Sequence, residues 1–218
     1  MAKPSALLLL SGGPDSAVMA AWAAQQGTYD CTALHVRFTN SSDEELRCAQ
    51  AAANSAKIPF NVIDMSKALA TCVKEGFARY TDIITLSLAA SFASARDIRN
   101  IFSAVIKEDE EKLQQNGTQL RENVQLLERL LGGSVKIHTP FLDKTKDEVL
   151  SLGQTLSVNF KDTISCFQPV GSKHCGVCEA CHSRCAAFKK NGMKDPVEYN
   201  TLPTGKPVVA KVFDCCCI

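Results

Sequence analysis

Short apolar runs alternate with amphipathic segments along most of this 218-residue chain. The apolar runs have the length of strands, and the segments between them carry apolar residues at helical spacing. Strands that alternate with helices are joined by right-handed crossovers, which place them parallel in one sheet covered on both faces. The pattern therefore predicts an α/β fold built on a doubly wound parallel sheet.

The predicted strands are 6–10, 31–36, 60–65, 100–105 and 135–140, and the predicted helices are 14–26, 42–57, 82–96, 119–131 and 145–156. Ser42 and Thr145 each begin a Ser/Thr-x-x-Glu capping pattern, which is typical of a helix start. The charged segment 107–119 interrupts the alternation. We expect it to form a solvated loop or a helix end at the carboxyl edge of the sheet, where ligand-contacting loops lie. The alternative is a passive surface insertion.

Composition is that of an ordinary globular domain, with 45% hydrophobic residues, 22% charged residues and a formal net charge of +1. A charge so close to zero argues against a nucleic-acid surface or an acidic membrane as partner. The apolar run near the amino terminus is shorter than a signal-peptide core, and no run approaches the roughly 18 residues of a membrane span. We therefore expect a cytoplasmic protein.

The hexapeptide Ser-Gly-Gly-Pro-Asp-Ser, residues 11–16, separates the first predicted strand from the first predicted helix. The glycines let the backbone approach an anion, and the helix amino terminus attracts it. Asp15 would repel phosphate unless it held Mg²⁺, whereas Ser11 and Ser16 offer hydroxyl donors. Pro14 suits a first helical turn. The Gly-Lys-Ser/Thr ending of a Walker loop is missing. The segment is therefore either another kind of phosphate-binding loop or a simple glycine turn.

This hexapeptide resembles the pyrophosphate loop of the PP-loop ATPases, which cleave ATP between its α- and β-phosphates and transfer AMP. The resemblance implies a nucleotide-binding stretch of Leu8, Leu9, Leu10, Ser11, Gly12, Gly13, Pro14, Asp15, Ser16, Ala17 and Val18. Residues 139–149 are similar to a later segment of those enzymes, in which a lysine supports the phosphates. Lys146 fits that position, and Lys144 is a weaker candidate. We predict catalytic roles for Asp15 on Mg²⁺ and pyrophosphate, for Ser16 on phosphate and for Lys146 on developing charge.

Eleven cysteines are many for a cytoplasmic chain, and five of them fall between Cys166 and Cys185. The spacing C-x8-C-x2-C-x2-C brings together four candidate ligands, Cys166, Cys175, Cys178 and Cys181. Four thiolates complete a tetrahedral Zn²⁺ site, and the Cys-Pro ending of the usual bacterial iron–sulfur run is missing. We expect His174 and His182 to lie outside the ligand set, and Cys185 to be a small buried side chain.

The two motifs in this order resemble one family, the 7-cyano-7-deazaguanine synthases of the queuosine pathway. Segments 86–93, 160–167 and 176–199 are also similar, and the resemblance covers roughly residues 6–199. It implies a homodimeric zinc enzyme that uses ATP and Mg²⁺ to adenylate 7-carboxy-7-deazaguanine, admits ammonia to form the amide, and dehydrates the amide to the nitrile. It also implies an ATP-binding domain over 1–160, a zinc-binding helical module over 161–200 and a tail over 201–218.

Two stretches depart from the family pattern. Residues 79–82 replace a Pro-Gly-Arg-Asn-type stretch, and segment 107–119 replaces a Tyr-Pro-Asp-Cys-type loop that helps to grip the deazaguanine. A carboxylate is then needed to accept from the donor edge of the base, and the candidates are Glu108, Asp109, Glu110 and Glu122.

Other functions stay open. A divergent relative could stop at the amide or couple the activated carboxylate to a protein amine, as is implied by relatives in antiviral gene clusters. A zinc-bearing module that binds ATP and docks a partner is the non-enzymatic alternative, and a tRNA-modifying enzyme would need a basic surface. The ending Cys-Cys-Cys-Ile formally fits a prenylation box at Cys215, but we expect a flexible tail.

Overall fold

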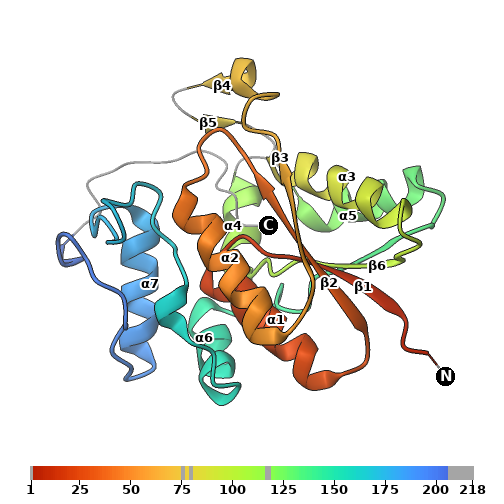
Figure 1. The fold of residues 1–218 in the computed structure, drawn as a ribbon. Helices are drawn as coiled ribbons and strands as arrows, with labels where there is room; N and C mark the ends of the chain where they lie inside the picture. Colours follow the sequence, from red (N-terminus) through yellow and green to blue (C-terminus); the bar gives the residue numbers. More distant parts are fainter. Residues whose placement is uncertain (1, 75–76, 79–80, 116–118, 206–218) are drawn as a thin grey trace.

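A five-stranded parallel sheet with the order β3-β2-β1-β6-β7 forms the centre of the protein (Figure 1). The computed structural model describes residues 2–74, 77–78, 81–115 and 119–205. The strands of this sheet are β1 (Ser5–Leu9), β2 (Asp30–Arg37), β3 (Phe60–Asp64), β6 (Asn100–Phe102) and β7 (Lys136–His138). In register, Leu8 of β1 pairs with Ala33 of β2 and with Phe102 of β6. The predicted doubly wound α/β fold is confirmed.

Helices flank the sheet on both faces (Figure 1). They are α1 (Pro14–Gln26), α2 (Asp43–Ala56), α3 (Thr81–Ser94), α4 (Lys107–Gln115), α5 (Leu120–Leu130), α6 (Lys146–Thr155) and α7 (Glu179–Lys190), with 3-10 turns η1 (Ala70–Cys72) and η2 (Phe160–Asp162). A short antiparallel pair, β4 (Val73–Lys74) and β5 (Phe77–Ala78), projects from the main sheet.

Alternate side chains of the strands enter two separate cores, as expected for a sheet that is covered on both faces. Ala6 and Leu8 of β1 pack in a core that contains residues of α1, α2, α6 and α7. Leu7 and Leu9 pack in the opposite core, with residues of α3 and α5. The two faces of β1 therefore hold the helices of both layers in place.

The chain reverses its direction of travel across the sheet next to β1. From β1 it proceeds to β2 and β3 on one side, and it then crosses over to β6 and β7 on the other. The loops that follow β1 and β6 consequently diverge at the carboxyl edge of the sheet. Such a topological switch point is where open α/β sheets bind ligands.

The predicted capping patterns are present at two helices. The Ser42 hydroxyl accepts from the Glu45 amide at 3.1 Å, and the Glu45 carboxylate accepts from the Ser42 amide at 3.0 Å. At α6 the Glu148 carboxylate accepts from the Thr145 amide at 2.8 Å. These bonds satisfy amides that a helix start leaves without partners.

The expected loop at 107–119 is wrong for residues 107–115, which form helix α4. The Asp109 carboxylate accepts from the Ile106 amide at 3.3 Å, and acidic residues fill the first turn, where they suit the helix dipole. Four strands also end earlier than predicted: β1 at Leu9, β3 at Asp64, β6 at Phe102 and β7 at His138. Leu10 and Val105 are nevertheless buried beyond the ends of β1 and β6, so apolar sequence there extends past the strand. No helix among the described residues has the length and hydropathy needed to cross a membrane.

Candidate functional site

The loop from β1 to α1 presents the start of a helix at the topological switch point. Gly13 is the N-cap of α1, and no side chain caps this helix. The Ser11 hydroxyl accepts from the Gly13 amide at 3.3 Å, and the Ser16 hydroxyl donates to the Gly13 carbonyl at 3.0 Å. Because the first amides of a helix have no intrahelical partners, this end of α1 is suited to bind an anion.

Lys146 and Asp15 meet beside this loop. The Lys146 Nζ lies 2.7 Å from Asp15 Oδ2, and the two side chains are only 15% and 16% exposed. Asp15 Oδ1 is buried without a hydrogen-bond partner among the described residues. Asp15 lies in the first turn of α1, and its side chain is largely buried. The structure thus brings together two of the three predicted catalytic residues, with Ser16 one position away.

The apolar residues of the predicted nucleotide-binding stretch belong to the cores. The side chains of five of them are buried, namely Leu8, Leu9, Leu10, Ala17 and Val18. A nucleotide could therefore contact only their backbone atoms, or the part of a side chain that lines a cavity. Their assignment to the binding stretch stays a prediction.

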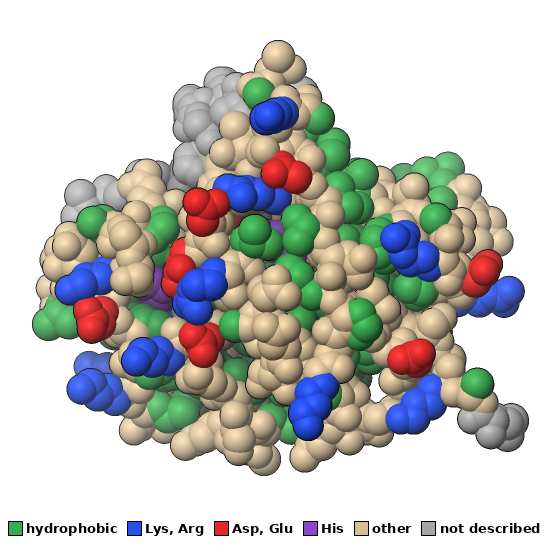
Figure 2. Space-filling model, in the orientation of Figure 1, with side chains coloured by type: hydrophobic (Ala, Val, Ile, Leu, Met, Phe, Trp, Pro, Cys, Tyr) green, Lys and Arg blue, Asp and Glu red, His purple; other side chains and the backbone are tan. Residues whose placement is uncertain are grey.

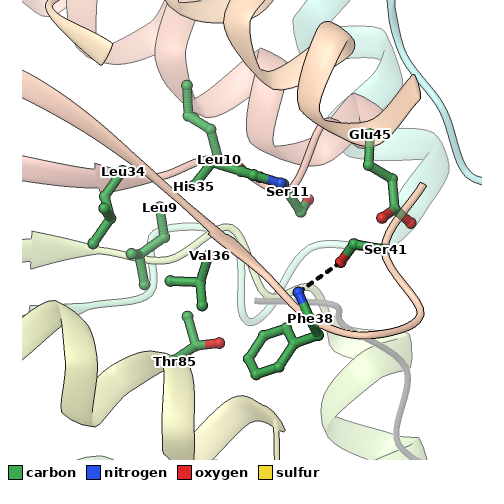
Figure 3. A pocket seen from close by; sticks show the side chains of 10 residues that line it. All are labelled: Leu9, Leu10, Ser11, Leu34, His35, Val36, Phe38, Ser41, Glu45 and Thr85. Carbon is green, nitrogen blue, oxygen red and sulfur yellow. Dashed lines mark hydrogen bonds between the residues drawn. The ribbon is translucent and has the colours of Figure 1, made fainter. Parts of the chain in front are cut away.

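A cavity opens between the ends of β1 and β2 and the start of α2 (Figure 3). Apolar side chains of Leu9, Leu34 and Val36 line one part of it, and polar groups of Ser11, His35, Ser41, Glu45 and Thr85 line the rest. Figure 3 shows the Glu45 carboxylate and the Ser41 hydroxyl close together at one end. The cavity volume of about 20 Å³ is enough for about one water and too small for a nucleotide or a base.

Burial changes the ionisation of two groups in this cavity. It raises the pKa of Glu45 to about 7, against the opposing effect of the hydrogen bond from the Ser42 amide. It also lowers the pKa of His35. His35 Nδ1 is 2.7 Å from the Leu10 carbonyl oxygen, so Nδ1 carries the proton and Nε2 is left as an acceptor. Sequence reasoning did not select either residue, because a strand histidine and a capping glutamate are ordinary in any α/β protein.

The glycine loop is held from two sides. Gly12 has φ +89°, and a Cβ placed there would overlap the carbonyl oxygen of Glu45. The Gly12 carbonyl accepts from the Ile164 amide at 2.9 Å, which joins the loop to the segment before the cysteine cluster. Only glycine fits this backbone conformation and this close approach.

Three of the four carboxylates proposed to read a deazaguanine accept hydrogen bonds from backbone amides. Glu108 accepts from the Lys146 amide at 3.0 and 3.2 Å, and Glu110 accepts from the Leu120 amide at 3.3 Å. Asp109 caps its own helix, and Glu122 is exposed on α5. To bind Glu108, Asp109 or Glu110, a base would have to displace the backbone amide from which that carboxylate now accepts. Residues 79–80 and 116–118, in the two stretches that depart from the family pattern, lie outside the described residues.

The four predicted metal ligands converge in one place. The sulfur atoms of Cys166, Cys175, Cys178 and Cys181 lie within 4.8 Å of one another, and all four residues are buried. A tetrahedral Zn²⁺ with Zn–S bonds of about 2.3 Å needs sulfurs roughly 3.8 Å apart, so this cage fits the ion. Hydrogen bonds among these thiols lower the pKa of Cys178 and raise the pKa of Cys166 and Cys181, so one thiolate is favoured within the group.

The remaining residues near the cage have other roles. His174 is buried with its ring edge-on to Tyr199 at 5.4 Å, and burial lowers its pKa to about 4. Neither His174 nor His182 belongs to the four-sulfur group. Cys185 was expected to be buried, but it is partly exposed on the outer side of α7, where it lines a groove with His182. The Cys-Cys-Cys-Ile ending lies outside the described residues.

A buried arginine joins the cysteine segment to the rest of the fold. Arg184 is fully buried and pairs with Asp195 through two contacts, of 2.8 and 3.1 Å. It also donates to the Thr163 hydroxyl at 2.9 Å and to the Phe160 carbonyl at 3.0 Å. Because Ile164 follows directly and bonds to Gly12, this network supports the glycine loop. The sequence did not indicate this network, because a single arginine in a helix has no distinctive pattern around it.

Lysine, arginine and acidic side chains are interspersed on the face shown in Figure 2, with no large area of one sign. This mixture agrees with the net charge of +1. A nucleic-acid-binding face would instead gather positive charge.

Comparison with known proteins places the chain in one family. A family model described as "Queuosine biosynthesis protein QueC" matches residues 5–74 and 72–192. Relatives named 7-cyano-7-deazaguanine synthase, from Caldicellulosiruptor bescii and Methanospirillum hungatei, are each 29% identical to this chain. The alignments cover 89% of this chain and 96% and 99% of the two relatives.

Solved structures share the fold at low identity. The U34-tRNA thiolase NcsA from Methanococcus maripaludis has a TM-score of 0.59 at 15% identity, over 88% of this chain and 68% of that chain. NMN synthetase from Francisella tularensis has a TM-score of 0.56 at 17% identity, over 88% and 79%. These likenesses show that the α/β fold is shared. Since the family model spans far more than half of the chain, the protein belongs to the queuosine biosynthesis protein QueC family.

Proposed function

We propose that this chain is an ATP-dependent carbon–nitrogen ligase that converts 7-carboxy-7-deazaguanine and ammonia to the amide, and then to the nitrile 7-cyano-7-deazaguanine. The observation that carries the proposal is the meeting of an uncapped helix start with Asp15 and Lys146 at the switch point of the sheet. Relatives named for this enzyme match along nearly their whole length.

The reaction needs activation, because oxide or hydroxide is a very poor leaving group from a carboxylate. A carboxylate oxygen of the substrate attacks the α-phosphorus of ATP, and the bond to the β-phosphate oxygen breaks to release pyrophosphate. Ammonia then attacks the acyl carbon, AMP leaves with the ester oxygen, and nitrogen loses a proton. In the second round the amide oxygen attacks another ATP, and loss of AMP and two protons from nitrogen leaves the nitrile.

The residues of the loop suit the first of these steps. The amides at the start of α1 face the place where pyrophosphate carries its charge, with Ser11 and Ser16 as further donors. The Lys146 ammonium would leave Asp15 for a phosphate oxygen as negative charge develops. Such donors, fixed before the reaction, contribute more to the rate than groups that must first reorganise. No protein nucleophile is needed.

Two metal ions fit this chain. Asp15 would hold Mg²⁺, since its Oδ1 is buried without a partner among the described residues and carboxylate oxygen is the ligand that Mg²⁺ prefers. When bound, Mg²⁺ neutralises charge on the phosphates. Cys166, Cys175, Cys178 and Cys181 would hold Zn²⁺ in a closed site, whose contribution is folding energy rather than catalysis.

The acceptor is expected in the crevice between the loops that follow β1 and β6. The Ser103 hydroxyl lies just past β6, is buried, and has no partner among the described residues. It is therefore a candidate contact for the deazaguanine. Glu108, Asp109 and Glu110 of α4 are less suitable, because they already accept hydrogen bonds from backbone amides.

The test is incubation of the purified protein with ATP, Mg²⁺, ammonium and 7-carboxy-7-deazaguanine, followed by mass spectrometry of nucleotides and deazapurines. We expect AMP, pyrophosphate and the nitrile. AMP with the amide alone would mean that the enzyme stops early, and AMP with a mass increase on an added protein would mean a protein amine as acceptor. No AMP with any acceptor would overturn the ligase proposal in favour of a binding module.

Asp15→Asn sharpens this test. The amide keeps the size of the side chain but removes the charge that Mg²⁺ requires, so AMP formation should fall by on the order of 10²-fold or more. Asp30→Asn is the matched control, since Asp30 is exposed at the opposite end of the sheet, where β2 begins. Equal rates in the parent and Asp15→Asn would show that Asp15 is misassigned.

A further inference from the structure

We propose that Glu108 is a positioning residue for the reaction, and that it acts by fixing the backbone from which Lys146 reaches Asp15. The role in catalysis rests on the proposed function, but the contact itself does not. The Lys146 amide donates to Glu108 Oε1 at 3.0 Å and to Oε2 at 3.2 Å. The Lys107 amide donates to the Lys144 carbonyl at 3.0 Å. The start of α4 is therefore bonded to both sides of Thr145, the N-cap of α6.

A carboxylate is well suited to this place. Lys146 is the first residue of α6, and the amides of a first turn lack partners within the helix. The negative charge of Glu108 also suits the positive end of the helix dipole. The Glu108 carboxylate accepts from the Lys146 amide, so this amide is not available to a phosphate. The Lys146 ammonium is then the group of this residue that would contact phosphate.

The position of the Lys146 ammonium depends on its backbone. The side chain is 15% exposed and spans from α6 to Asp15 on α1, so it has little freedom to compensate for a shift of the helix. The first turn of α6 is held on another side by α7, where Lys190 Nζ lies 2.8 Å from Asp147 Oδ2 and the Asn191 amide group donates to the Asp147 carbonyl at 2.8 Å. On the side of α4, the start of α6 is held by Glu108 and by the Lys107 amide, which donates to the Lys144 carbonyl.

Helix α4 is itself anchored at further points. Glu110 accepts from the Leu120 amide at the start of α5, and Lys112 Nζ lies 2.9 Å from Glu179 Oε1, next to Cys178. The helix thus joins the loop after β6, where the acceptor is expected, to the segment that carries Lys146. Within α4, Glu108 is the residue that contacts the start of α6, from which the Lys146 side chain extends.

A double-mutant cycle tests the proposal, with pyrophosphate release measured for the parent, Glu108→Ala, Lys146→Ala and the double variant. We expect Glu108→Ala to lower kcat about tenfold with a smaller change in the KM for ATP. If Glu108 acts through Lys146, it should cost nothing further in the Lys146→Ala background. Equal losses in both backgrounds would overturn the proposal, because a general structural defect is additive.

Two more variants separate position from charge and from helix stability. Glu108→Gln keeps a carbonyl oxygen that accepts from the Lys146 amide, and it should recover most of kcat. Glu111→Ala removes an exposed carboxylate of the same helix, whose contact is a 4.0 Å ion pair with Lys107, and it should match the parent. A loss in Glu111→Ala as large as that in Glu108→Ala would also contradict the proposal.

Hydrogen exchange of the Lys146 amide, followed by NMR, decides the contact without any turnover. We expect faster exchange in Glu108→Ala than in the parent and in Glu111→Ala. Unchanged exchange would overturn the proposal even in an active enzyme. A parent that releases no pyrophosphate would instead refute the ligase function, and the exchange result would then still decide whether Glu108 holds the start of α6.

Discussion

The Lys146 ammonium lies 2.7 Å from the Asp15 carboxylate, although the two residues are 131 positions apart. The pair joins the first turn of α1 to the first turn of α6 across the switch point of the sheet. Both side chains are largely buried beside the glycine loop. Mg²⁺ and phosphate would separate the pair, with the cation bound by Asp15 and the anion by Lys146.

Lys146→Ala should therefore slow pyrophosphate release by on the order of 10²-fold, because a cation close to developing charge is lost. Asp15 would also lose its partner in a largely buried place, so the melting temperature should fall. Lys136→Ala is the control, since that side chain is exposed at the start of β7. Kinetics and a thermal melt check both effects. Similar losses of turnover in the two variants would contradict the assignment of Lys146.

Local patterns were sufficient to predict most of the fold and part of the site. The α1 boundaries, 14–26, follow from Pro14 at the start and Gly27 in the left-handed conformation at the end. The cysteine cage follows from spacing, because Cys-x-x-Cys turns bring sulfurs together whatever surrounds them. Asp15 and Lys146 belong to two separate sequence motifs. Their contact could not be predicted from either motif, because it depends on how α1 and α6 pack.

Other features depend on tertiary contacts that no local pattern indicates. Residues 107–112 are all charged, and Leu113 is the only apolar residue of segment 107–115, so the sequence indicates a solvated segment. In the structure, Glu108 and Glu110 instead accept hydrogen bonds from amides of α6 and α5. Arg184 is likewise buried only because Asp195 and the Phe160 carbonyl meet it there. Charged residues are ambiguous in sequence, since the same side chain can face solvent or cap a distant helix.

Gly12→Ala should destabilise the protein and abolish nucleotide turnover. The position has φ +89°, and the new methyl group would overlap the Glu45 carbonyl at the start of α2. A non-glycine residue in such a conformation costs about 1–3 kcal/mol, and displacement of α2 adds to this. Chemical denaturation measures the loss of unfolding free energy.

Gly13→Ala is the matched control for that substitution. Gly13 has φ −74°, which any residue adopts. Its added Cβ would lie 3.3 Å from the Ser11 hydroxyl, which can rotate, and 3.6 Å from the Ile164 carbonyl. We expect a loss of less than about 1 kcal/mol. An equal loss at both glycines would show that φ and the Glu45 contact do not set the requirement at Gly12.

Cys178→Ser should remove bound metal and destabilise the carboxyl-terminal segment. Cys178 is fully buried in the four-sulfur cage, and loss of a ligand is felt as lost folding energy. Elemental analysis of the purified protein should show much less than one zinc per chain, and the melting temperature should fall by several degrees or more, on the order that about 1 kcal/mol or more produces.

Cys185→Ser is the control for the cage. Cys185 is partly exposed on α7 and stands outside the four-sulfur group, so metal content and stability should stay at the parent values. If Cys178→Ser retained a full complement of zinc and Cys185→Ser lost it, the ligand set would have to include Cys185 in place of Cys178.

Glu45→Gln should flatten one part of the dependence of stability on pH. Burial raises the pKa of Glu45 from an ordinary 4.5 to about 7, so the folded protein holds this proton more tightly than the unfolded chain does. The stabilisation from protonated Glu45 is then fully present at acid pH and is lost as pH rises from about 4.5 through about 7. At pH 8 the parent should have lost about 1–3 kcal/mol by this route, after allowance for partial screening by solvent.

Glutamine can replace Glu45 without loss of the helix cap, because its amide oxygen also accepts from the Ser42 amide. Unfolding free energies at pH 5 and pH 8 should therefore converge in Glu45→Gln relative to the parent. Titration of His35, whose pKa burial lowers, destabilises both proteins alike as pH falls and so cancels in the comparison. Glu122→Gln, an exposed change on α5, should follow the parent. Parallel curves for the parent and Glu45→Gln between pH 5 and pH 8 would mean that the Glu45 carboxyl ionises as it does in water, and that the cavity beside the glycine loop is better hydrated than its lining indicates.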